Sequence, residues 1–75
     1  MKIHEITGLL EDAGANITAA FEGSRELDPG VIIDDKYILQ YAVYCKHPFI
    51  LDDMYCREIA NFDNMDEVIN HIRRK

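Results

Sequence analysis

Seventy-five residues are enough for one small domain, spanning 1–75, and leave no room for a second. A chain this short buries only about 60% of the surface that its unfolded form exposes, so its core is thin and a deep cleft between domains is excluded. The 48% hydrophobic content is ordinary for a folded protein and excludes native disorder. The 14 acidic and 8 basic residues give a net charge of −6.

The charge is distributed unevenly along the chain. Three of the bases are the last three residues, Arg73, Arg74 and Lys75, so positions 1–72 hold 14 acids and 5 bases, a charge of −9. Nucleic-acid binding draws its affinity from Lys and Arg side chains that displace counterions from phosphates. The acidic body therefore predicts no direct contact with nucleic acid.

The N-terminal segment and the uncharged runs argue against export and membrane insertion. Residues 1–5 hold one lysine followed by an acid, with no apolar region, which is unlike a signal peptide. The uncharged runs 13–21 and 37–45 are much shorter than the roughly 18–20 apolar residues of a membrane span. We therefore expect a cytoplasmic protein, with Cys45 and Cys56 as small buried thiols in a reducing compartment.

Apolar residues at helical spacing predict a helix at each end of the chain. The first stripe consists of Ile3, Ile6, Leu9, Leu10 and Ala13. The second consists of Met65, Val68, Ile69 and Ile72. Gly14 is placed to end the first helix in a left-handed conformation. Asn64 and Glu67 have the spacing of a capping box at the start of the second.

Two-residue alternation and β-forming residues predict strands between the helices. Residues 17–21 alternate, and 37–45 are rich in aromatic and branched side chains. Residues 31–33 form a further short extended stretch. Residues 54–61 are predicted to be the third main strand, and the alternative is a helix capped at Asp52 or Asp53.

The predicted fold is α+β, in the order α-β-β-β-α, with a three-stranded antiparallel sheet and both helices packed on one face. The element order is similar to that of the double-stranded RNA-binding domain. That family binds phosphates through lysines at the start of its last helix, where residues 64–67 here read Asn-Met-Asp-Glu. The similarity is therefore limited to element order and implies no function.

The sequence offers little that could perform catalysis or hold a cofactor. Ser24 is the single serine, and no glycine-rich phosphate loop is present. Cys45 and His47 are close in sequence, but no third group orients them and their spacing fits zinc poorly. The aspartate pairs lack the spacing of a calcium loop. We expect a protein that is not an enzyme and has neither a metal nor a cofactor.

Exposed tyrosines beside acids are typical of a protein-binding surface. The predicted binding residues are Asp34, Asp35, Asp52, Asp53, Tyr37, Tyr41 and Tyr44. An alternative is that most of the tyrosines complete the thin core, with their hydroxyls at its rim. The aspartates are also suited to turns, because their side chains bond to their own backbone.

The sequence therefore predicts a small acidic protein-binding module. It would act as an inhibitor or nucleic-acid mimic that covers a basic surface, such as that of a nucleic-acid-binding protein. Proteins of phages and mobile elements that block host nucleases are similar in size and charge. The alternative is a structural module that forms a homodimer through strand edges or the tyrosine-bearing face of the sheet.

Overall fold

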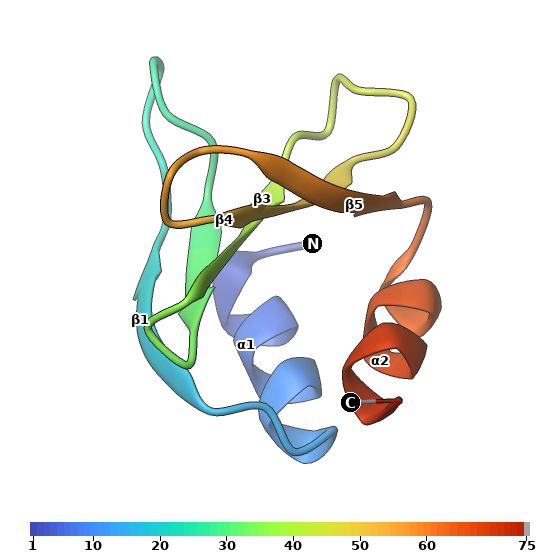
Figure 1. Ribbon diagram of the computed structural model, residues 1–75. Coiled ribbons are helices and arrows are strands. Elements are labelled where there is room, and N and C mark those ends of the chain that lie inside the picture. The colour runs from blue at the N-terminus through green and yellow to red at the C-terminus, as the bar shows by residue number, and fades with distance from the viewer. Residues whose placement is uncertain (75) are drawn as a thin grey trace.

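The computed structural model describes residues 1–74, in which five strands lie between two helices in chain order. The elements in chain order are α1 (Ile3–Asp12), β1 (Ile17–Phe21), β2 (Gly30–Ile33), β3 (Tyr37–Tyr41), β4 (Phe49–Asp53), β5 (Glu58–Phe62) and α2 (Met65–Arg73). Each strand pairs antiparallel with the next, so the sheet order β1-β2-β3-β4-β5 follows the chain. The sheet is strongly twisted, and α1 and α2 lie together on one side of it (Figure 1).

The prediction of a three-stranded sheet is wrong, because the sheet has five strands, although the α+β class is correct. Residues 31–33 belong to a full strand, β2, and the segment 49–53 forms β4. Residues 54–61 are not helical: a turn occupies 54–57, and β5 follows it. The similarity in element order to the double-stranded RNA-binding domain is lost with the two added strands.

The predicted helix ends are confirmed by their hydrogen bonds. The Asn64 side chain accepts from the Glu67 backbone N–H at 3.0 Å, which satisfies one of the free donors at the start of α2. The Glu67 carboxylate accepts from the Asp63 backbone N–H at 2.8 Å and not from that of Asn64, so the cap is confirmed but the reciprocal bond of the capping box is shifted by one residue. At the end of α1, Gly14 adopts φ 95°, a left-handed conformation that glycine tolerates without strain.

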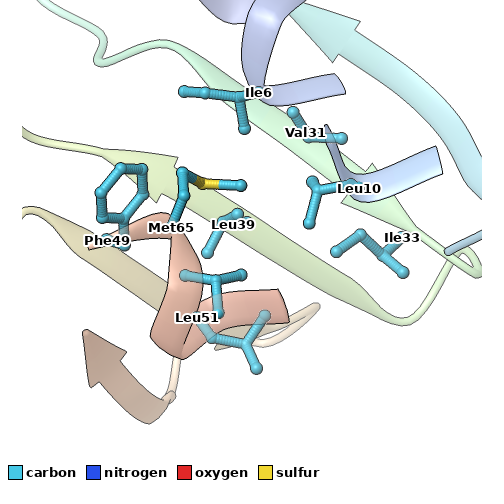
Figure 2. Close-up of a cluster of buried hydrophobic side chains, with 9 residues drawn as sticks. Ile6, Leu10, Val31, Ile33, Leu39, Phe49, Leu51 and Met65 are labelled. Atoms are coloured by element: carbon cyan, nitrogen blue, oxygen red, sulfur yellow. The ribbon is translucent and has the colours of Figure 1, made fainter. Parts of the chain in front are cut away.

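The core lies between the helices and one face of the sheet. Ile6 and Leu10 of α1 meet Val31 and Leu39, and α2 supplies Met65 to the same cluster (Figure 2). Side chains alternate across a strand, so every second residue of β2, β3 and β4 enters this cluster. We call this the covered face. The opposite face has neither helix over it, and we call it the open face.

Both edge strands of the sheet are irregular. In β1 the pairing with β2 shifts between Ile17 and Ala19. In β5, Ala60 pairs with Leu51 and Glu58 pairs with Asp52, so Ile59 is an extra residue without a partner on β4. Such bulges bend a strand and interrupt the row of backbone groups that a further strand would need.

The core predicts a sharp difference between two neighbouring leucines of α1. Leu10 is 0% exposed, whereas Leu9 is 38% exposed. Leu10→Ala removes buried methyl groups and leaves a cavity, so the free energy of unfolding should fall by about 2–5 kcal/mol. Leu9→Ala is the matched control and should change it by less than about 1 kcal/mol. Urea denaturation of both variants measures the difference, and equal losses would contradict this placement of the core.

Candidate functional site

Strand register divides the seven predicted binding residues between two ends of the sheet. Tyr37 at the start of β3 pairs with Asp53 at the end of β4, so the β2–β3 and β4–β5 turns lie at the same end. We call this the hairpin end. Loops 22–29 and 42–48 extend from the opposite end, at the top of Figure 1, which we call the loop end.

Five of the seven residues belong to the hairpin end, and two belong to the loop end. Asp34, Asp35, Tyr37, Asp52 and Asp53 form the first group. Tyr41 and Tyr44 form the second. The structure thus places the two aspartate pairs at the same end of the sheet and separates them from two of the tyrosines.

Asp34 and Asp35 form the β2–β3 turn and hold their carboxylates in solvent. Both have positive φ, 55° and 54°, and the Lys36 backbone N–H donates to the Ile33 carbonyl at 3.0 Å. Tight hairpin turns need positive φ at both central positions, where aspartate, asparagine and glycine are preferred. Both side chains are exposed.

Asp53 organises the turn between β4 and β5. Its Oδ1 accepts from the backbone N–H groups of Tyr55 and Arg57, at 2.8 and 3.0 Å. Its Oδ2 accepts from Arg57 Nε at 2.8 Å. The hydrogen bond from the Arg57 backbone is the largest cause that lowers the pKa of Asp53, with smaller contributions from the Tyr55 backbone and the Arg57 side chain. Asp53 therefore remains charged and fixes the turn.

This turn presents an exposed apolar tip. Met54 is exposed, and Tyr55 is 80% exposed, with the Arg57 guanidinium 5.4 Å from the centre of its ring. Cys56 is an exposed free thiol with φ 63°. Aromatic side chains held on a fixed turn lose little conformational freedom on binding, which favours protein contacts.

Asp52 lies on the open face and is only 9% exposed. Its Oδ2 accepts from Gln40 Nε2 at 3.1 Å, and Glu58 stands directly opposite on β5. Burial raises the pKa of Asp52 most, and the charges of Glu58 and Asp53 raise it further. Like charges directly opposite each other destabilise a strand pair, so this position costs stability when both groups are ionised.

The open face consists of two rows of side chains that cross all five strands. Register places Ala19, Ile32, Ile38, Asp52 and Glu58 in one row. It places Phe21, Gly30, Gln40, Ile50 and Asn61 in the other. A Cβ at Gly30 would lie 2.6 Å from the Phe21 ring, so this ring lies over the glycine.

The three tyrosines differ in their surroundings. Tyr37 and Tyr41 are partly buried against the core on the covered face, and the Tyr41 ring stacks on Phe49 with centres 4.9 Å apart. Tyr44 is 76% exposed, and its hydroxyl donates to Asp28 Oδ2 at 2.8 Å. That hydrogen bond and the charge of Asp28 raise the pKa of Tyr44. Tyr44 thus links the two loops at the loop end.

Sequence reasoning missed Glu58, Gln40 and Met54 as surface residues of interest. The first two gain meaning only from the strand register, which sets Glu58 opposite Asp52 and Gln40 diagonal to it. A local signal existed for the turn: Asp53 and Arg57, four residues apart, flank a three-residue loop that requires a left-handed residue, here Cys56.

Residues 1–74 contain no group of three or more His, Cys, Asp or Glu side chains arranged to hold a metal ion. Within the same residues, neither helix is long and apolar enough to cross a membrane. Cys45 and Cys56 are free thiols at opposite ends of the sheet, Cys45 half-buried and Cys56 exposed, so the prediction that both are buried is wrong. Comparison with protein-family models, curated proteins and solved structures finds no match to this chain. Any function must therefore be argued from its own surface.

The raised pKa of Asp52 predicts how an asparagine at this position will behave. The native protein holds the Asp52 proton to a higher pH than the unfolded chain, whose pKa is near the ordinary 3.8. The contribution of Asp52 to the stability of the wild type therefore falls as the pH rises from that value through the native pKa, and is level above it. Asp52→Asn keeps an acceptor for Gln40 but has no charge, so it should be more stable than the wild type at pH 7.

The difference between the two proteins should shrink toward zero as the pH falls below about 3.8, where Asp52 is protonated in both states. Asp53 titrates with the opposite sign, but it is present in both proteins and cancels in the comparison. Urea denaturation at pH 3 and pH 7 measures the effect. The prediction would be contradicted if Asp52→Asn lowered the free energy of unfolding at pH 7, or if it raised that free energy equally at both pH values.

Proposed function

We propose that this protein is a small acidic binding module that docks its hairpin end on a basic surface of a partner protein and performs no chemistry of its own. One observation carries the proposal: two turns at the same end of the sheet carry the exposed carboxylates of Asp34 and Asp35 and the exposed side chains of Met54 and Tyr55. An aromatic anchor ringed by charges is the usual composition of an interface centre and its rim.

The charges of Asp34 and Asp35 are exposed to a partner, whereas the charge of Asp53 is paired within its own turn. Arg57 is the base closest to Asp53, and its Nε is already bonded to that carboxylate. Asp34 and Asp35 are exposed on a rigid turn that Lys36 closes through its backbone. Carboxylates held in this way attract a surface of lysines and arginines and can occupy the positions that nucleic-acid phosphates would take. Inhibition of a nucleic-acid-binding protein, of the kind found in phages and mobile elements, is the specific form of this proposal.

A pair of matched charge variants tests the proposal. Asp34→Asn with Asp35→Asn removes two charges from the hairpin end, and asparagine tolerates the positive φ of the turn. Glu11→Gln with Asp12→Asn removes two charges from exposed positions of α1. Proteins captured from cell extract by the wild type are identified and purified, and their affinity is then measured against both variants at low and high salt.

The hairpin variant should bind its partner about tenfold more weakly, or about 1.4 kcal/mol, because the charge opposite the partner's bases is lost. The α1 variant should bind as the wild type does. Wild-type affinity should fall steeply with salt, and duplex DNA should compete for the partner. Equal effects of the two variants, or binding that does not depend on salt, would contradict the proposal.

The alternative, a homodimer formed through strand edges or the tyrosine-bearing face, has less support. Bulges interrupt both edge strands, and Tyr37 and Tyr41 lie on the face that the helices cover. Sedimentation at micromolar concentration separates the two: a monomer agrees with docking on a different protein, and a tight dimer favours self-association.

A further inference from the structure

One of the two rows of side chains on the open face is apolar at one end and acidic at the other. Ile32 and Ile38 pair across β2 and β3, and the row continues directly to Asp52 and Glu58 on β4 and β5. The isoleucines are half-buried and do not belong to the core cluster on the covered face. No helix of residues 1–74 covers this row. Ile32 and Ile38 are partly exposed and Glu58 is exposed, whereas Asp52 is 9% exposed, so a partner would reach the acidic end of the row through Glu58.

Among residues 1–74, no ion pair is formed by Asp52 or Glu58, the acidic end of this row. Neither row of the open face contains a lysine or arginine, and Arg57 donates its Nε to Asp53. Side chains directly opposite on antiparallel strands have Cβ atoms only about 4.5–5.5 Å apart, so one cation can contact both carboxylates. Gln40 occupies one oxygen of Asp52, and Asn61 donates to Glu58 at 3.2 Å, and both donors are neutral.

We propose that the open face binds an amphipathic segment of the partner protein, with an apolar side chain on Ile32 and Ile38 and an arginine or lysine between Asp52 and Glu58. This inference rests on the proposed function, since it names a second contact with the same basic partner. Face-to-face contact with a second copy fits poorly, because two open faces would bring acids together with no base between them.

The geometry favours a segment that crosses the strands. Neighbouring strands lie about 4.8 Å apart, so the middle of the isoleucine pair and the middle of the acid pair are roughly 10 Å apart. Two residues of extended chain cover about 7 Å, and the length of an arginine side chain covers the rest. A leucine followed two residues later by an arginine therefore matches the spacing.

The test uses a defined probe, acetyl-Leu-Ala-Arg-amide, with the same peptide carrying neutral citrulline in place of arginine as its control. Each is titrated into the ¹⁵N-labelled protein and followed by amide chemical shifts. The arginine peptide should shift the amides of Ile38, Asp52 and Glu58, and the citrulline peptide should bind at least about fivefold more weakly. Shifts confined to the 34–36 turn, or equal binding of the two peptides, would overturn the inference.

Glu58→Gln separates a binding role from a structural one. It relieves the repulsion on Asp52 and keeps an acceptor for Asn61, so the free protein should melt at a higher temperature while its affinity for the arginine peptide falls several-fold. Glu11→Gln makes the same change of charge on α1. It should change both the melting temperature and the affinity for the arginine peptide by less than Glu58→Gln does. Loss of stability in Glu58→Gln, or unchanged affinity, would overturn the inference.

The same variants keep this inference distinct from the proposed function. One outcome is that the captured partner binds the Asp34→Asn, Asp35→Asn variant more weakly than the wild type while binding Glu58→Gln with unchanged affinity. That result would support docking through the hairpin end and overturn binding at the open face. If the arginine peptide maps to the open face but no partner responds to the hairpin variant, the open face binds and the proposed docking end is wrong.

Discussion

Burial of one face of a sheet by two short helices is the constraint on which the rest of this structure depends. Five strands present two faces, but residues 1–74 form only the helices α1 and α2 to cover them, and both pack on the same side. Alternation then sends every second strand residue to a face that no helix covers. The isoleucines of the open face follow directly from this imbalance, and so does the need for polar groups beside them to keep that face from associating with itself.

Turn geometry accounts for the positions of the acids but not for their charge. The left-handed turn at 34–35 accepts asparagine or glycine as readily as aspartate, and an asparagine in place of Asp53 would still accept the two backbone hydrogen bonds. Turn formation therefore requires the shape of these side chains and leaves the charge unexplained. The proposed docking on a basic surface gives that charge a role, because exposed carboxylates attract bases and repel other acidic copies.

Local chemistry made much of the fold predictable from the sequence. The cap at Asn64, the end of α1 at Gly14 and the strand at 17–21 each depend on a few neighbouring residues, and each is confirmed. The strand β4 was missed, because its apolar run is only three residues and ends in two aspartates, which strands disfavour. Asp52 is tolerated there because it points to the open face, and Asp53 because it forms the turn.

The candidate site was less predictable, because it depends on register. The alternation in 37–41 correctly groups Tyr37 and Tyr41 with Leu39, but nothing local says that this group lies under the helices. Glu58 stands opposite Asp52 only because a bulge at Ile59 shifts the pairing by one residue. Without that bulge, Ile59 would face Asp52, and the acidic pair would not exist. A single irregularity in an edge strand thus interrupts that edge against further strand pairing and also places two carboxylates directly opposite each other.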